Sequence, residues 1–168
     1  MEFIYVSSVC SDKKFNEIFD KSEVKPQQQA QKFHSLLSKG LCNYANNLYF
    51  ISRPPINSTT KKDINLMGSE EFFDNKTYYY LKISDSALLK HIGLFSSAFM
   101  YSIKSYFRNK TEQKIIICDI LNLSISISAL LSSKLFGMKS VAVVTDLPNY
   151  MNYTNQSQSV ISKFYSSV

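Results

Sequence analysis

The chain has 168 residues and a mass of 19.3 kDa, enough for one domain with a sizeable hydrophobic core and too few for two ordinary domains. Hydrophobic residues make up 45% of it and charged residues 19%, which excludes a disordered or collagen-like chain. The net charge of +6 is uneven: residues 1–85 hold eleven basic and ten acidic residues, and residues 86–168 hold eight and three. A cationic second half suits phosphate-bearing partners or an anionic membrane surface, and charge alone does not choose between them.

The cysteines Cys10, Cys42 and Cys118 are odd in number, lie far apart and form no C-x-x-C pair. This usage is typical of a reducing compartment and predicts neither a disulfide framework nor a metal site. The first residues lack the basic segment and long apolar run of an export signal, and no run of about 20 apolar residues predicts a membrane-spanning helix. We therefore expect a cytoplasmic protein.

The first third of the chain predicts a strand, a helix and a second strand. Residues 2–9 are a short apolar run of the kind found in buried parallel strands, and the polar residues 10–25 follow as a connection. Pro26 stands where the first turn of a helix favours proline, and apolar residues then recur at helical spacing up to residue 40. Residues 47–52 predict the second strand, which Pro54 stops because proline cannot donate to the hydrogen-bond ladder.

A third strand and a long helix are expected in the middle of the chain. Residues 57–76 are interpreted as a polar connection, and residues 78–83 are rich in the aromatic and branched side chains that favour strands. Residues 88–110 have the apolar periodicity of a helix with one face toward the core. Lys90, Lys104 and Arg108 lie on the opposite face of this helix. That basic stripe is either an ordinary solvated surface or a peripheral contact with anionic lipid headgroups.

The last third completes the alternation. Residues 114–119 predict a fourth strand, and a Ser- and Leu-rich helix runs from there to Gly137, which suits a C-cap. Residues 140–145 predict a fifth strand, followed by a loop over 149–157 and an amphipathic helix over 158–168. This order predicts one α/β domain over residues 1–168, an open, doubly wound, mostly parallel Rossmann-like sheet with helices on both faces.

Polar residues stand at the predicted strand ends. In such a sheet the ligand crevice lies beyond the carboxyl ends of the strands, where the strand order reverses. Ser7 and Ser8 end the first strand, Asp119 and Asn122 follow the fourth, and Asp146 follows the fifth. Serine and aspartate at strand ends also cap helices and close turns, so each residue alone is ambiguous. Their convergence from three strands favours a ligand site.

Several kinds of chemistry are not predicted. None of the four glycines follows the first strand, so the glycine-rich turns of dinucleotide-binding and P-loop proteins are missing, and no G-x-S-x-G elbow appears. His34 is interpreted as a packing residue at the edge of the core rather than as a base, and His91 lies on the flank of the long helix. Cys10 follows the first strand, but no histidine lies near it in sequence to make it a nucleophile.

Four segments, in their order and spacing, resemble the amino-terminal half of GT-B glycosyltransferases of the retaining, family-four type. They are Ile4–Ser8 at the start of the sheet, Pro26–His34 on the first predicted helix, Ile115–Asp119, and Val143–Pro148. In this family two Rossmann-like domains face one cleft, the first binding mainly the acceptor and the second the nucleotide-sugar. The resemblance covers nearly the whole chain and implies that the donor-binding domain is not part of it.

The resemblance implies a hexosyltransferase-type enzyme of bacterial polysaccharide or glycolipid synthesis, inactive as this chain alone. Its donor is a nucleotide-sugar, its acceptor a glycan or a lipid-linked glycan, and it needs no cofactor. The matching aspartate, Asp146, is expected to accept a hydrogen bond from the acceptor hydroxyl, with Ser7, Ser8, Asp119 and Asn122 binding the acceptor.

A noncatalytic, flavodoxin-like module that binds a phosphate-bearing ligand through its cationic half remains the alternative. No pattern of interleaved aromatic and basic residues indicates a nucleic-acid partner.

Overall fold

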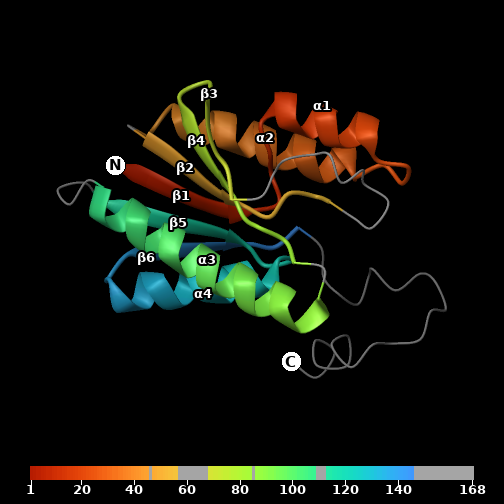
Figure 1. Ribbon diagram of the computed structural model, residues 1–168. Coiled ribbons are helices and arrows are strands. Elements are labelled where there is room, and N and C mark those ends of the chain that lie inside the picture. Colours follow the sequence, from red (N-terminus) through yellow and green to blue (C-terminus); the bar gives the residue numbers. More distant parts are fainter. Residues whose placement is uncertain (46, 57–67, 85, 109–112, 146–168) are drawn as a thin grey trace.

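The computed structural model describes residues 1–45, 47–56, 68–84, 86–108 and 113–145. Its elements, in chain order, are β1 (Glu2–Ser7), α1 (Asp12–Lys21), α2 (Gln28–Cys42), β2 (Asn47–Ser52), β3 (Glu70–Phe73), β4 (Lys76–Tyr80), α3 (Ala87–Arg108), β5 (Lys114–Asp119), α4 (Leu123–Leu135) and β6 (Lys139–Val143). Six strands form one sheet, with α1 and α2 on one face and α3 and α4 on the other (Figure 1). The predicted α/β class and mostly parallel, doubly wound sheet are confirmed.

The strand order is β3-β4-β2-β1-β5-β6, and only the β3–β4 pair is antiparallel. The chain starts in the middle of the sheet at β1, moves outward through β2 to β4, and returns across the sheet to β5 and β6. The direction of winding therefore reverses between β1 and β5, which is where sheets of this kind bind their ligands.

Two hydrophobic cores lie on the two faces of the sheet. Along β1, Phe3 and Tyr5 belong to the core beneath α1 and α2, whereas Ile4 and Val6 belong to the core beneath α3 and α4. Successive side chains of a strand point to opposite faces, so a central strand covered on both faces needs apolar residues at every position. This explains why β1 is a continuous apolar run.

Helix α1 lies in the segment expected to be a polar connection, so that expectation was wrong. Phe15 and Ile18 are buried at helical spacing, and the Ser11 side chain accepts a hydrogen bond from the Lys14 backbone at 3.1 Å as the N-cap. The other side chains of α1 are mostly charged. These charged residues make the helical pattern hard to recognise in the sequence. The two buried apolar residues and the serine cap are nevertheless enough to form a short helix against the sheet.

Strand β3 lies in the second segment predicted to be a connection. Asp74 and Asn75 both have positive φ angles, 51° and 57°, as a two-residue type I′ turn requires, and they join β3 to β4 as a hairpin. The hairpin adds an antiparallel edge strand that was not predicted. It also starts β4 two residues before the predicted 78, while the predicted strand 140–145 runs instead from Lys139 to Val143. The loop over 149–157 and the helix over 158–168 lie outside the described residues.

A buried polar row fixes the register of the three central strands. Glu2 pairs with Asn47 of β2 and with Lys114 of β5 in the sheet register. The Asn47 amide donates to Glu2 Oε1 at 2.7 Å, the Lys114 ammonium donates to Glu2 Oε2, and it donates also to the Ser105 carbonyl of α3 at 3.0 Å. Glu2 and Lys114 are both buried, so each ion depends on the other for its neutralisation.

Replacing Lys114 with methionine tests this row. Lys114→Met leaves the Glu2 carboxylate buried without its counter-ion, which we expect to lower the free energy of unfolding by about 3–5 kcal/mol in urea titrations. The matched control is Lys104→Met, which removes a lysine from the exposed pair with Glu70 and is expected to cost at most about 1 kcal/mol. Equal losses for the two variants would contradict the role of the buried row.

Candidate functional site

The ends of β1 and β5 lie together at the point where the winding reverses. Val6 pairs with Cys118 across these strands, and the next residue on each is Ser7 and Asp119. Because the two strands are parallel, both side chains come to the same edge of the sheet, as predicted. Ser8 follows the end of β1, and Asn122, the N-cap of α4, follows the end of β5.

The loop after β1 is held by side chains instead of being shaped by glycines. Ser7 is buried, and its hydroxyl accepts a hydrogen bond from the Val9 backbone at 3.1 Å. Gln31 of α2 forms a pair of hydrogen bonds with Cys10, accepting from its backbone N–H at 3.1 Å and donating to its carbonyl at 2.7 Å. The Ser11 backbone N–H donates to the Tyr80 hydroxyl at 3.1 Å. These bonds fix the backbone that leads away from Ser8.

Glu71 of the β3–β4 hairpin secures the far end of the same loop. Its Oε2 atom accepts from the Tyr80 hydroxyl at 2.5 Å and from the Ser11 hydroxyl at 2.8 Å. The hairpin that the sequence did not reveal therefore connects the edge of the sheet to the start of α1. Neither Gln31 nor Glu71 was singled out in the sequence, because buried polar contacts between distant segments leave no local pattern.

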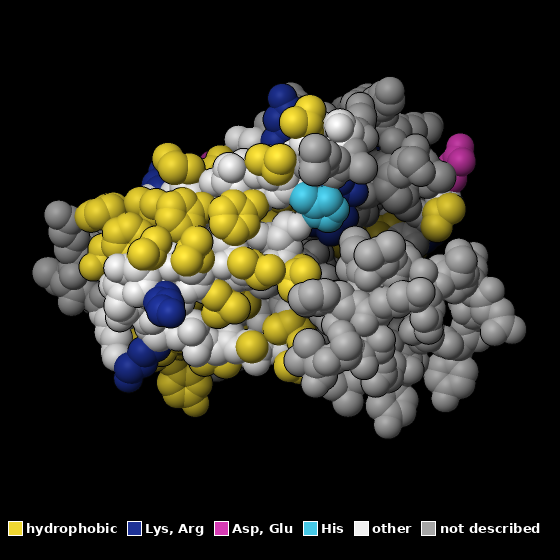
Figure 2. Space-filling model, turned by 90° about the horizontal axis from the view of Figure 1, so that it is seen from below, with side chains coloured by type: hydrophobic (Ala, Val, Ile, Leu, Met, Phe, Trp, Pro, Cys, Tyr) yellow, Lys and Arg dark blue, Asp and Glu magenta, His cyan; other side chains and the backbone are white. Residues whose placement is uncertain are grey.

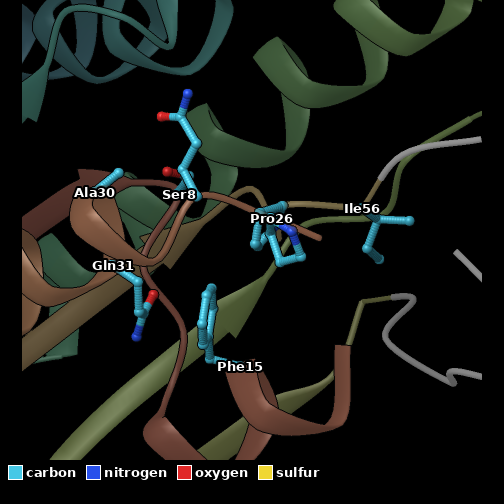
Figure 3. Close-up of a pocket in the computed structure, with 8 residues that line it drawn as sticks. Ser8, Phe15, Pro26, Ala30, Gln31 and Ile56 are labelled. Atoms are coloured by element: carbon cyan, nitrogen blue, oxygen red, sulfur yellow. The ribbon is translucent and has the colours of Figure 1, made fainter. Parts of the chain in front are cut away.

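A cavity of about 280 Å³ opens beside this loop, between α1, α2 and the end of β2 (Figure 3). Its walls are formed by Ser8, Phe15, Pro26, Gln27, Ala30, Gln31, Pro55 and Ile56. Figure 3 shows the Phe15 ring rising from α1 toward the segment that carries Pro26, with Gln31 beside it on α2. The lining combines one hydroxyl, two amides, an aromatic ring and aliphatic surface, and none of the lining side chains carries a charge. Of the predicted site residues, Ser8 lines this cavity.

Asp119 is buried behind this edge, with only 2% of its surface exposed. Its Oδ1 atom accepts from the Leu121 backbone at 3.1 Å, and its Oδ2 atom accepts from the Asn122 amide at 2.9 Å and lies 3.5 Å from His34 Nε2. Burial alone would raise the pKa of Asp119, but the contacts with His34, the Leu121 N–H and Asn122 outweigh it and lower that pKa. Asp119 is thus an ionised carboxylate committed to holding the start of α4.

His34 was interpreted from the sequence as a packing residue at the edge of the core. In the structure it is buried and makes polar contacts on both ring nitrogens. It is 3% exposed and lies between the Tyr5 hydroxyl, 2.7 Å from Nδ1, and the Asp119 carboxylate. We infer from these partners that Nε2 carries the ring proton and faces Asp119, and that Nδ1 accepts the hydrogen bond that the Tyr5 hydroxyl donates. Burial, together with the negative charge of Asp119, raises the pKa of Tyr5, so its hydroxyl keeps the proton that it donates. The three residues link α2, β1 and β5.

Arg53 is a further residue at this edge that the sequence analysis did not single out. It stands directly before Pro54, which was interpreted only as the end of the second strand. The Arg53 backbone N–H donates to the Ser7 carbonyl at 3.0 Å, which places it where β1 and β2 end. Its side chain is half-buried, and burial lowers the pKa of the guanidinium. No acidic side chain of the described segments lies within ion-pair distance of it. A partly desolvated cation without a counter-ion is a ready contact for an anionic group of a ligand.

The thiols near the site are not nucleophiles. Burial raises the pKa of Cys10 to about 12, and it does the same for Cys118 in β5. Only the thiolate is reactive, so both side chains stay protonated and inert at neutral pH. The expectation that Cys10 is not a nucleophile agrees with this environment.

The other predicted residues that the structure describes do not line the cavity. Asn122 is half-buried and turned onto Asp119, and Asp146 lies outside the described residues. On α3, Lys104 donates to Glu70 at 3.1 Å, and Arg108 donates to the Tyr79 hydroxyl at 2.9 Å and lies 3.6 Å from Glu70. Two cations of the predicted membrane stripe therefore share a carboxylate of β3.

Within the described ranges, no cluster of three or more His, Cys, Asp or Glu side chains is arranged to hold a metal ion. Among the helices described, none is long and apolar enough to cross a membrane. No model of a known protein family matches the chain, and no curated protein is significantly similar to it.

The role of Asp119 predicts how stability depends on pH. A carboxyl whose pKa is lowered on folding stabilises the protein above its unfolded pKa, about 3.9, and this contribution is lost as the pH falls through the folded pKa. We expect Asp119→Asn to lower the free energy of unfolding at neutral pH by about 1–3 kcal/mol and to flatten its decline below about pH 4. Urea titrations across this pH range measure both effects.

The control is Asp20→Asn, an exposed position on α1. It should follow the wild-type curve. An Asp119→Asn protein that declines as steeply as wild type in acid would contradict the assigned contacts.

Proposed function

We propose that this chain is the acceptor-binding half of a GT-B-type glycosyltransferase, which transfers a sugar from a nucleotide-sugar to a hydroxyl group of a glycan or lipid-linked acceptor. The observation that carries the proposal is the uncharged cavity beside the carboxyl ends of β1 and β2. Open α/β sheets bind ligands beyond the carboxyl ends of their strands. The chemistry of the cavity then selects the class of ligand.

The lining suits a sugar ring better than a phosphate. The Phe15 ring and the two prolines offer surface to the C–H face of a pyranose, while the Ser8 hydroxyl and the Gln27 amide can bond to its hydroxyls. Gln31 keeps one N–H and one oxygen lone pair beyond its bonds to Cys10. Pockets for drug-sized ligands have volumes of about 300–1,000 Å³. The cavity is slightly smaller than this range, which suits a single sugar ring.

The predicted acceptor residues take different roles in this proposal. Ser8 contacts the sugar directly, because it alone of the four lines the cavity. Ser7, Asp119 and Asn122 are positioning residues, since their side chains are engaged in the turn after β1 and in the start of α4. Arg53 supplies positive charge near the same strand ends for a phosphate of the acceptor or of the leaving group, where charge develops in glycosyl transfer.

Ligand binding by the 168-residue chain tests the proposal. In saturation-transfer NMR we expect a panel of uncharged methyl hexosides to bind at millimolar concentration and Ala30→Phe, which fills the cavity, to abolish the signal. The matched control is Ala142→Phe, an exposed position on β6. Arg53→Gln should leave the affinity for uncharged glycosides unchanged. It should lower the affinity for sugar phosphates by about tenfold, the effect expected from losing one charge-assisted hydrogen bond.

The same binding experiments distinguish the glycosyltransferase from the alternative, a noncatalytic module that binds a phosphate-bearing ligand. Binding of inorganic phosphate or nucleotides that requires Arg53 and tolerates Ala30→Phe, with no binding of uncharged glycosides, would favour a noncatalytic module for a phosphate-bearing ligand and contradict the transferase.

Asp146 is proposed to accept a hydrogen bond from the attacking hydroxyl of the acceptor, with the donor held by a second domain. In a protein that carries both domains, Asp146→Asn is expected to slow sugar transfer by about 100-fold, a typical loss for one acid–base contact. A transfer rate equal to that of wild type would remove Asp146 from the mechanism.

A further inference from the structure

Helix α4 has the reverse of the usual amphipathic pattern. Its buried side is largely serine, and its hydroxyls bond to backbone carbonyls: Ser126 donates to Asp119 and Ser128 donates to Phe95 of α3, both at 2.7 Å. These small side chains let α4 pack closely against the sheet and α3, with Ile125 as the large apolar residue buried among them.

Four large apolar residues of α4 face outward, whereas Ile125 is buried. Leu123, Ile127, Leu131 and Leu135 recur every four residues and are between 42% and 62% exposed. At 1.5 Å per residue they form a ridge about 18 Å long on the outer surface of the helix. A helix on the protein surface normally has polar side chains on its outer side. An apolar ridge in that position therefore indicates a surface that binds a partner.

Helix α3 extends the same surface. Leu89, Ile92, Met100 and Phe107 are each about half exposed on its outer side. Figure 2, which looks onto α3 and α4, shows hydrophobic side chains spread over both helices. We call these eight residues of α3 and α4 the apolar face.

Among the described residues, the charged side chains of α3, α4 and β6 are all positive. Neither α3 nor α4 contains an aspartate or a glutamate. Lys134 lies near the end of the α4 ridge, Lys139 follows at the start of β6, and Lys90 lies near the start of α3. Lys104 and Arg108 are turned toward Glu70 at the sheet edge and are not counted in this rim.

We propose that the apolar face docks onto the surface of an anionic lipid bilayer, with the leucine and isoleucine side chains in the interface and the lysines against the headgroups. An exposed apolar helix surface bordered by lysines is typical of a segment that lies in a bilayer interface. A second copy of the chain would set the same lysines against each other, so charge complementarity favours an anionic partner. This proposal relocates the predicted membrane contact from the basic stripe of α3 to the apolar face and does not depend on what the cavity binds.

Sedimentation of the 168-residue chain with vesicles tests the proposal. We expect the chain to bind phosphatidylcholine vesicles that contain phosphatidylserine and to bind pure phosphatidylcholine vesicles much less. Ile127→Ser combined with Leu131→Ser should weaken binding by about tenfold or more, because two aliphatic side chains are lost from the interface. Lys134→Gln combined with Lys139→Gln should weaken it at low salt and have little effect at high salt.

The matched control is Val24→Ser combined with Leu36→Ser, two exposed apolar positions away from the apolar face. This pair should bind vesicles as wild type does, and circular dichroism with thermal unfolding verifies that each variant is folded. Absence of vesicle binding by the wild-type chain, or equal binding by the two double serine variants, would overturn the proposal. So would a concentration-dependent dimer that Ile127→Ser and Leu131→Ser dissociate while vesicle binding is absent, since the face would then join two copies.

Discussion

The polar row of Asn47, Glu2 and Lys114 is the constraint on which the rest of the structure depends. It crosses three adjacent strands at one level of the sheet and attaches them to α3 through the Ser105 carbonyl. A slip of one residue in β1 would separate the buried ions and turn every β1 side chain to the opposite core. Because the register is fixed at the amino ends of the strands, their carboxyl ends finish level, and the residues after them meet at one edge.

Rigidity at that edge comes from side chains. Proteins that bind nucleotides after the first strand use glycines to bring the backbone close to phosphate. Here Gln31, Tyr80 and Glu71 hold the corresponding loop through four hydrogen bonds from α2, β4 and β3, and the Tyr80 hydroxyl also donates to Glu71. The result is a neutral, preformed cavity near the half-buried guanidinium of Arg53, which has no acidic partner among the described residues. This combination suits a ligand with a neutral sugar ring and a nearby phosphate, which is why we favour the acceptor half of a glycosyltransferase.

Apolar runs and proline positions were enough to predict the parallel strands. Helical spacing predicted α2 and α3, and the Ser- and Leu-rich stretch before Gly137 predicted α4. Helix α1 and strand β3 were missed because their signals are small: a serine cap with two buried apolar residues, and an Asp-Asn turn. At the site, the meeting of Ser7 with Asp119 followed from strand direction alone. The burial of His34, the hydrogen bonds of Gln31 to the loop and the place of Arg53 at the strand ends depend on contacts between distant segments, which sequence spacing does not encode. The reversed pattern of α4 likewise becomes visible only once its serines are seen against α3.

We propose that the carboxyl ends of β1 and β2 form a sugar-binding crevice. A crystal structure of the 168-residue chain with a hexose 1-phosphate tests it most directly. The account predicts electron density for the ring between Ser8, Phe15 and Gln31 and for the phosphate within reach of Arg53. An empty cavity with the sugar phosphate bound at the amino ends of the strands, or on the outer surface of α3 and α4, would contradict it.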